Sequence, residues 1–247
     1  MNAPRLQFSA QAHPAGEERL EKMRSTMAGA SSIRLLEFAL REAFPKRIAV
    51  ISSFAAESAV LLHQVARLDP ETPVLFLNTG KLFGETLRYR DRLQDEFGLT
   101  DIRAIGPNPS DRSRFDSDGT LWSRDPDACC HLRKVVPLRK AVAGFEAIIT
   151  GRKRFQTNQR GTMEPIEFSA GLFRFNPLAD WSLAELQGYA AENNLPMHPL
   201  AGDGFLSIGC LPCTRRTDPG ENYRDGRWPG FAKTECGIHT GLHGDGI

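Results

Sequence analysis

Three short apolar runs, each followed by a helical pattern, constrain the fold of this chain more than any other feature. The runs are RIAVISS (47–53), PVLFLN (73–78) and FEAIIT (145–150). Each run is continuous and contains β-branched residues, which is typical of a strand that is buried on both faces. The helical patterns between the runs predict parallel pairing through crossover connections. We therefore expect an α/β fold, with a twisted parallel sheet and helices on both of its faces.

Weaker patterns predict the remaining elements. A short strand is expected near Ile102, and Ser182 is predicted to cap a helix over 183–193. Residues up to about Ala15 are polar and show no period, and after Leu195 glycine and proline become frequent and the period fades. The other predicted elements are two helices within 17–43, helices over 55–68, 85–97 and 133–143, and a strand over 173–178.

The length and composition predict one large domain with a segment at each end. The chain has 247 residues, of which 40% are hydrophobic, and this is enough to bury a single α/β core. We expect a partly flexible N-terminal segment (1–30), a central α/β domain (31–228) and a mobile C-terminal tail (229–247) that carries Cys236. The sequence leaves the oligomeric state open, and a homo-oligomer is compatible with it.

The charge balance argues against nucleic-acid and membrane partners. Lys and Arg number 31 and Asp and Glu 30, so the net charge is +1 and no global field attracts polyanions. Runs of about 18 apolar residues, which a membrane span needs, are absent. The first residues lack the apolar core of a signal peptide, so we expect a cytoplasmic protein. Five cysteines in such a chain indicate metal or thiol chemistry better than a disulfide framework.

Small and hydroxylated residues follow the first predicted strand, in ISSFAAESAV. Ser52, Ser53 and Ser58 can donate hydroxyl groups there, and free N–H groups at a helix start attract phosphate. No Gly-Lys-Ser/Thr follows, so this is not a Walker A loop. An ordinary turn explains the stretch equally well.

Two further strand ends carry candidate ligand groups. In LNTGKLFG, Leu77, Asn78, Thr79 and Gly80 fall at the end of the second strand, where a nucleoside could pack. In GRKRFQTNQR, Gly151 is followed by four basic residues, namely Arg152, Lys153, Arg154 and Arg160. Exposed basic runs are usually only solvated. Their position at the same edge of the sheet favours binding of phosphate or sulfate.

Four of the five cysteines form two close pairs. Cys129 and Cys130 are adjacent, and Cys210 and Cys213 form a C-x2-C. Four thiolates fit tetrahedral zinc or an iron–sulfur cluster. Neighbouring side chains diverge, so adjacent cysteines suit a [4Fe–4S] cluster, with its several irons, better than one zinc ion. Cys236, in TECGIH, is left over.

The combination CC, G-R-K-R-x-Q, S-I-G-C-x-P-C-T-R, G-R-W and E-C-G-I-H resembles the assimilatory sulfonucleotide reductases, and within them the bacterial iron–sulfur adenylyl-sulfate (APS) reductases. The resemblance spans residues 31–239 and implies an adenine nucleotide α-hydrolase-like fold. It implies that Cys236 is the nucleophile. Implied ligands of a [4Fe–4S] cluster are Cys129, Cys130, Cys210 and Cys213. Implied substrate-binding residues are Ser52, Ser53, Phe54, Glu57, Ser58, Leu77, Thr79, Gly80, Lys134, Gly151, Arg152, Arg160, Arg224, Arg227 and His239.

The resemblance further implies a two-step reaction. The Cys236 thiolate would attack the sulfur of APS and release AMP, leaving an S-sulfocysteine. A thioredoxin or glutaredoxin thiol would then release sulfite. The loop SSFAAESAVLLH is also similar to that of reductases acting on 3′-phosphorylated APS (PAPS), so a PAPS or dual-substrate reductase is an alternative. Alternatives of other classes are an adenylating or thiolating enzyme with structural zinc, and a non-catalytic iron–sulfur sensor.

Overall fold

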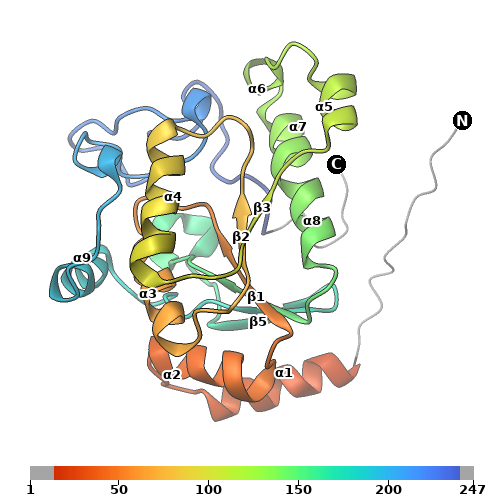
Figure 1. Ribbon diagram of the computed structural model, residues 1–247, viewed down its shortest axis with the longest axis vertical. Coiled ribbons are helices and arrows are strands. Elements are labelled where there is room, and N and C mark those ends of the chain that lie inside the picture. Colours follow the sequence, from red (N-terminus) through yellow and green to blue (C-terminus); the bar gives the residue numbers. More distant parts are fainter. Residues whose placement is uncertain (1–13, 240–247) are drawn as a thin grey trace, which may run out of the picture.

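The computed structural model describes residues 14–239, which form a six-stranded sheet flanked by helices (Figure 1). The strand order is β3-β2-β1-β4-β6-β5, and all neighbouring pairs are parallel except β5 with β6. The strands are β1 (Ile48–Ser52), β2 (Val74–Leu77), β3 (Ile102–Ile105), β4 (Ala147–Thr150), β5 (Ile166–Ser169) and β6 (Leu172–Phe175).

Alternate residues of each central strand face different helices, which confirms the predicted two-sided sheet. In β1, Ile48 and Val50 belong to a large core, whereas Ala49 and Ile51 belong to a smaller one on the opposite face. Residues of α3 (Ser58–Leu68), α4 (Gly84–Phe97) and α9 (Leu183–Glu192) enter the first core. The second core is closed by α8 (Val136–Val142), which Figure 1 shows apart from α3 and α4.

The remaining helices lie before the sheet and in the long β3–β4 connection. The predicted pair within 17–43 is α1 (Pro14–Thr26) and α2 (Ser32–Glu37), and α2 runs into a wider π-type turn (Phe38–Ala43). Residues 14 and 15, predicted to be loose, already belong to α1, while residues 1–13 and 240–247 lie outside the described part. Three short helices were not predicted: α5 (Pro109–Phe115), α6 (Leu121–Arg124) and α7 (Pro126–Cys130).

The sheet is parallel, as predicted, except for one strand at its edge. The predicted strand over 173–178 is β6, and it forms an antiparallel hairpin with β5. The hairpin turn, Ala170-Gly171, has φ of +51° and +75°. This left-handed pair is ordinarily signalled by Asn-Gly or Asp-Gly, and an alanine at the first position hides it from sequence analysis.

The predicted cap of α9 is confirmed. The Ser182 Oγ accepts a hydrogen bond from the Glu185 N–H at 3.2 Å, and the Glu185 carboxylate accepts one from the Ser182 N–H at 2.7 Å. This reciprocal pair is a capping box, which satisfies two backbone donors that the helix leaves free. None of the described helices is both long and apolar enough to span a bilayer.

A buried histidine beyond α9 makes the stability of the fold depend on pH. The His198 Nδ1 accepts a hydrogen bond from the Leu200 N–H at 3.2 Å, so Nε2 carries the proton and donates to Thr86 on α4 at 3.0 Å. Burial lowers the pKa of His198 to about 4. Its neutral form therefore belongs to the folded state.

We expect the folded protein to lose stability as the pH falls from about 6.5 to about 4, because only the unfolded state binds a proton at His198 in this window. The full effect is about 3 kcal/mol at this one site. Thermal unfolding midpoints of the wild type and His198→Gln should therefore converge between about pH 7 and about pH 5. A difference in midpoint that is independent of pH would contradict the assignment.

Candidate active site

A cavity lies where the carboxyl ends of three parallel strands meet. β1 pairs with β2 on one side and with β4 on the other. The strands that follow β1 are therefore added first on one side of it and then on the other. Such a switch point is where α/β sheets bind ligands. Ser52, Leu77 and Thr150 line the cavity from the three strand ends, as the sequence analysis expected of this edge.

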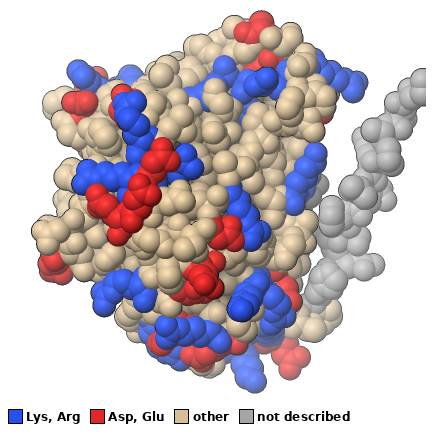
Figure 2. Space-filling view, in the orientation of Figure 1, with Lys and Arg blue, Asp and Glu red and all other residues tan. Residues whose placement is uncertain are grey.

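The cavity collects positive charge that the whole chain does not show. Figure 2 shows Lys and Arg interspersed with Asp and Glu over the surface in view. The cavity wall instead includes six basic side chains and two carboxylates. The basic residues are Lys134, Arg152, Lys153, Arg160, Arg224 and Arg227, and the carboxylates are Glu57 and Glu235. A site with this balance suits a ligand that carries several negative charges.

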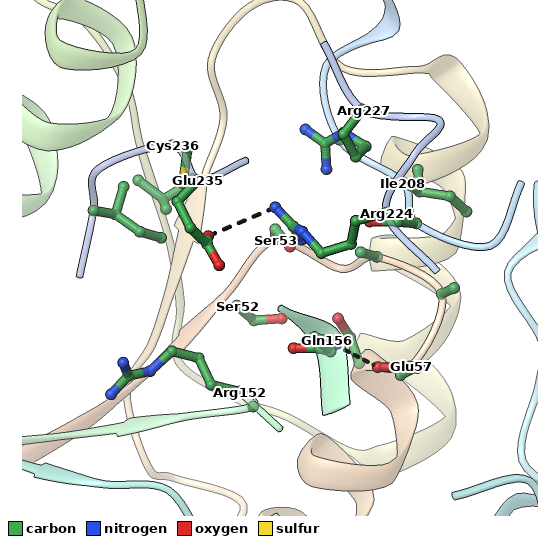
Figure 3. Close-up of a pocket in the computed structure, with 18 of the residues that line it drawn as sticks. Ser52, Ser53, Glu57, Arg152, Gln156, Ile208, Arg224, Arg227, Glu235 and Cys236 are labelled. Atoms are coloured by element: carbon green, nitrogen blue, oxygen red, sulfur yellow. Dashed lines mark hydrogen bonds and ion pairs between the residues drawn. The ribbon is translucent and has the colours of Figure 1, made fainter. Parts of the chain in front are cut away.

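Glu57 fastens the loop after β1 to two other segments. Its carboxylate pairs with the buried Lys153 and accepts hydrogen bonds from Gln156 Nε2 at 2.9 Å and from the Tyr223 hydroxyl at 2.6 Å (Figure 3). Burial raises the pKa of Tyr223, and the Glu57 charge adds to this effect, so the hydroxyl stays a donor. The loop is thereby held open beside the start of α3.

Arg152 is directed across the sheet. Its guanidinium pairs with Glu167 on β5 and donates to the Asn176 Oδ1 at 3.1 Å. Burial lowers the pKa of Arg152 to about 10, although the Glu167 charge acts against this. Arg152 remains a cation near neutral pH, and its position is set by the strand pair that the sequence analysis missed.

Arg160 and Arg224 bind the last described segment of the chain. Arg160 makes two hydrogen bonds to the Glu235 carboxylate, from Nε at 2.6 Å and from Nη2 at 2.8 Å. Arg224 Nη2 lies 3.6 Å from the same carboxylate, as the dashed line in Figure 3 marks, and donates to the Thr234 carbonyl at 3.0 Å. Glu235 thus brings its neighbour, Cys236, to the cavity wall.

The four paired cysteines gather in one buried place. Cys130, Cys210 and Cys213 pack with Trp228 in a small core, and Cys129 is buried next to Cys130. None of them forms a disulfide. Burial, with the neighbouring Cys130 charge adding to it, raises the pKa of Cys129 to about 12. These cysteines reach the site on segments that also carry the basic residues of the cavity.

Backbone pairing holds the C-x2-C segment between two walls of the cavity. On one side, Leu82 and Cys210 form an antiparallel bridge, and the Leu211 N–H donates to the Lys81 carbonyl at 2.8 Å. On the other side, the Trp228 N–H donates to the Cys213 carbonyl at 3.0 Å. Gly209 permits this packing, since an added Cβ would lie 2.1 Å from the Arg227 Nη2.

A widened helical turn buries the basic residues that follow the adjacent cysteines. Between α7 and α8 the helix takes a π-type turn (His131–Val135), just before Pro137, which lacks an N–H. Both Arg133 and Lys134 are buried there. Burial by itself would lower the pKa of Lys134, but the charges of Cys210, Cys236 and Cys130 raise it above its ordinary value. A buried ammonium group therefore lies among the thiols.

The four paired cysteines are the candidate ligands of a metal group. In the part of the chain from 14 to 239, no three His, Cys, Asp or Glu side chains are grouped so that they could hold a single ion. Tetrahedral zinc would need its sulfurs about 4 Å apart, at Zn–S distances of about 2.3 Å. Cys129 is adjacent to Cys130, and Cys130 packs with Cys210 and Cys213 in one buried core, so the four thiols could serve as ligands of separate irons.

Cys236 lies between the four paired cysteines and the cavity at the carboxyl ends of the strands. Its side chain is half-buried, lines the cavity and packs against the core of Cys130, Cys210, Cys213 and Trp228. Ile238 packs on the second core, and His239 is half-buried beside arginines. Burial lowers the pKa of His239 well below its ordinary value, and the nearby arginines lower it further. His239 is thus a neutral side chain.

Most residues predicted for the substrate line this one cavity. They are Ser52, Ser53, Glu57, Ser58, Leu77, Thr79, Lys134, Gly151, Arg152, Arg160, Arg224, Arg227 and His239. Phe54 and Gly80 do not line it. The Phe54 side chain is fully buried against Phe76, and its φ of +50° shapes the loop instead. Gly80, with φ of +71°, turns the chain after Thr79.

The sequence analysis missed five polar or aromatic residues of the cavity. They are Gln156, Ser207, Tyr223, Trp228 and Glu235. All except Tyr223 belong to the G-R-K-R-x-Q, S-I-G-C-x-P-C-T-R, G-R-W and E-C-G-I-H motifs already noted. Their motifs were the available signal, but only the folded chain brings Glu57 to Lys153 and Glu235 to Arg160.

Residues 47–216 match the phosphoadenosine phosphosulfate reductase domain family. A protein of Mesorhizobium japonicum named adenosine 5′-phosphosulfate reductase is 49% identical over 84% of this chain and 82% of its own length. A protein of Gloeobacter violaceus named phosphoadenosine 5′-phosphosulfate reductase is 39% identical over 80% of this chain and 84% of its own length. The sequence similarity thus covers both the α/β domain and most of the cavity.

The fold also matches a solved structure. The phosphoadenylyl-sulfate (PAPS) reductase of Candida auris superimposes with a TM-score of 0.69, at 24% identity, over 81% of this chain and 97% of its own. At this identity the match concerns the fold. It confirms the expected adenine nucleotide α-hydrolase-like architecture with a mostly parallel sheet.

Arg133, in the turn after the cysteine-bearing helix α7, forms a buried ion pair with Asp116 and a hydrogen bond to the segment after β2. Arg133 Nε lies 3.0 Å from the Asp116 carboxylate, and Arg133 Nη1 donates to the Thr79 carbonyl at 2.8 Å. The Asp116 and Arg133 side chains are 0% and 5% exposed. Removal of one partner of a buried pair leaves a buried charge without compensation.

We expect Asp116→Asn to lower the free energy of unfolding by about 3 kcal/mol, measured by denaturant unfolding of the purified protein. Asp118→Asn is the matched control, because Asp118 pairs with Arg124 at the exposed surface. The control should leave the unfolding midpoint nearly unchanged. Equal effects of the two substitutions would contradict a special role for the buried pair.

Proposed function

We propose that this chain, which belongs to the phosphoadenosine phosphosulfate reductase domain family, reduces adenylyl sulfate (APS) to sulfite and AMP. The observation that carries the proposal is the position of Cys236. It is the one cysteine outside the two close pairs, and it lines a cavity whose wall holds six basic side chains. Curated relatives named adenosine 5′-phosphosulfate reductase support APS as the substrate.

The cavity suits a nucleotide with an anionic end. The strand ends at Leu77 and Thr79 offer an apolar wall and backbone groups for the adenosine, and the serines after β1 suit its phosphate. Arg152, Arg224 and Lys134 surround the remaining space. Arginine forks and a lysine ammonium group match phosphate and sulfate oxygens.

In the first step, the Cys236 thiolate attacks the sulfur of the bound sulfate group. The bond between this sulfur and the bridging oxygen breaks, the electron pair leaves with AMP, and Cys236 carries an S-sulfonate. The cationic wall stabilises the negative charge that develops on the leaving phosphate. Lys134, held among the thiols, is the cation next to Cys236.

In the second step, a thiol of a thioredoxin or glutaredoxin attacks the Cys236 sulfur. Sulfite leaves, and a mixed disulfide forms between Cys236 and the reductant. A second thiol of the reductant resolves this disulfide, so that one dithiol is oxidised for each APS reduced. This step requires the Cys236 segment to move away from the cavity, and a cytoplasmic location would supply the reductant.

Cys129, Cys130, Cys210 and Cys213 are the residues that would hold a [4Fe–4S] cluster. Four free thiols buried in one place, next to Lys134 and Arg227, support this ligand set. When bound, the cluster would supply a negative charge and a tie between the two cysteine segments. The electrons come from the reductant thiols, so the cluster needs no redox change.

PAPS is a second candidate substrate. A relative named phosphoadenosine 5′-phosphosulfate reductase is 39% identical, and the loop SSFAAESAV is similar to that of PAPS-reducing enzymes. An adenylating enzyme with structural zinc would need no free Cys236 in the cavity. Sulfite release from APS in the presence of thioredoxin therefore tests the proposal against both alternatives.

We expect Cys236→Ser to abolish sulfite release from APS, because no S-sulfocysteine can form. AMP affinity and iron content should stay near those of the wild type, since Cys236 belongs to neither cysteine pair. Sulfite is measured with thioredoxin in excess, and AMP binding by calorimetry. Substantial turnover by this variant would show that another group is the nucleophile.

The protein purified without oxygen should contain about four irons per chain and little zinc. Alanine at any one of the four paired cysteines should remove the iron and the visible absorbance together. Iron and zinc are measured by elemental analysis, with Cys236→Ala as the control that keeps its iron. Stoichiometric zinc in active protein would rule the cluster out.

Among the two nucleotides, APS should have the higher kcat/KM. The comparison requires each nucleotide alone and then both in competition. We expect at least a tenfold preference, equivalent to about 1.4 kcal/mol in transition-state stabilisation. Preference for PAPS would move the assignment to the second candidate.

A further inference from the structure

The residue before Cys236 is bound more tightly than the thiol itself. The Glu235 carboxylate receives two hydrogen bonds from Arg160, at 2.6 Å and 2.8 Å, and one from the Thr157 hydroxyl at 3.2 Å. Arg224 Nη2 lies 3.6 Å from it. Figure 3 shows Glu235 and Arg224 facing each other across the cavity, with Cys236 directly beside Glu235.

The arginine that binds Glu235 is itself held by the rest of the site. Arg160 Nη1 donates to the Gln156 side-chain oxygen Oε1, and Gln156 Nε2 donates to the Glu57 carboxylate just before α3. Arg160 and Glu235 side chains are only 11% and 19% exposed. A bidentate pair of this kind fixes geometry as well as distance, and its shielding from water reduces screening. The segment with Cys236 is therefore anchored to a rigid frame.

Glu235 also has an ionised carboxylate. Burial raises its pKa, but the hydrogen bonds and charge of Arg160, followed by the charge of Arg224, outweigh this and lower the pKa below its usual range. The other ion pair of the segment, between Lys233 and Asp127 on α7, is exposed on its acidic side, because the Asp127 side chain is 60% exposed while the Lys233 side chain is 9% exposed. A carboxylate in contact with water is screened and contributes less than a buried one.

We propose that Glu235 is a positioning residue, which holds Cys236 over the cavity through its bond to Arg160 and Arg224. The inference rests on the proposed function only in taking Cys236 as the nucleophile. Since the thiol follows Glu235 directly, a shift of Glu235 moves the sulfur by a similar amount. Misplacement of a nucleophile by about 1 Å can slow a reaction about a hundredfold.

The test compares Glu235→Gln with Asp127→Asn in the cluster-loaded protein. Single-turnover formation of S-sulfocysteine at saturating APS is followed by mass spectrometry, and AMP affinity by calorimetry. Glu235→Gln should slow sulfonation at least about tenfold while the AMP dissociation constant does not rise more than about twofold. Asp127→Asn, which removes the exposed carboxylate of the Lys233 ion pair on the same segment, should change neither quantity by more than about twofold.

Two results would overturn the proposal. One is a sulfonation rate of Glu235→Gln within about twofold of the wild type. The other is a parallel loss of AMP affinity, which would make Glu235 a part of general site structure.

Amide hydrogen exchange over 232–238 without nucleotide gives a readout that needs no activity. Exchange should be faster in Glu235→Gln and in Arg160→Gln, no faster in their double variant than in either single one, and unchanged in Asp127→Asn. Unchanged exchange in Glu235→Gln would overturn the positioning role. If the wild type forms no S-sulfocysteine from APS, the proposed function fails, and the exchange data still decide whether Glu235 anchors the segment.

Discussion

Repulsion among cations in a confined space is the constraint on which the arrangement of this site depends. Six basic side chains line one cavity, and each loses hydration there. The fold offsets part of this cost by bringing carboxylates to four of the six cations. Glu57 pairs with Lys153, Glu167 pairs with Arg152, and Glu235 pairs with Arg160. These carboxylates come from three distant parts of the chain.

The pairing explains why segments that look unrelated in sequence form one site. The loop after β1 is fastened through Glu57, the β5–β6 hairpin through Glu167 and the C-terminal segment through Glu235. Each of these carboxylates fixes the position of a cation, and the cation in turn fixes the segment that carries the carboxylate. An arriving nucleotide with several negative charges finds the donors already oriented, so little of its binding free energy is spent on ordering them.

The segments that carry the paired cysteines also hold the loops around the cavity. The widened turn after Cys130 directs Arg133 to the end of β2, and the backbone of the C-x2-C segment pairs with the loop after β2 and with Trp228. The Cys236 segment is not tied in this way. Its closed position depends on side-chain contacts, which are easier to release in a reaction with two steps.

The sequence by itself determined the sheet and its two-sided burial, because continuous apolar runs with intervening helices admit few other folds. It also indicated which strand ends carry ligand groups, since parallel strands end at one edge, and it separated Cys236 from the paired cysteines. Tertiary structure alone decided the rest. The β5 strand was hidden by an alanine in a left-handed turn, and Phe54, predicted beside the substrate, has its ring in the core. The roles of Glu57, Glu167 and Glu235 could not be predicted, because each depends on which buried cation lies within hydrogen-bonding distance, and Lys153, the partner of Glu57, is 96 positions away in the chain.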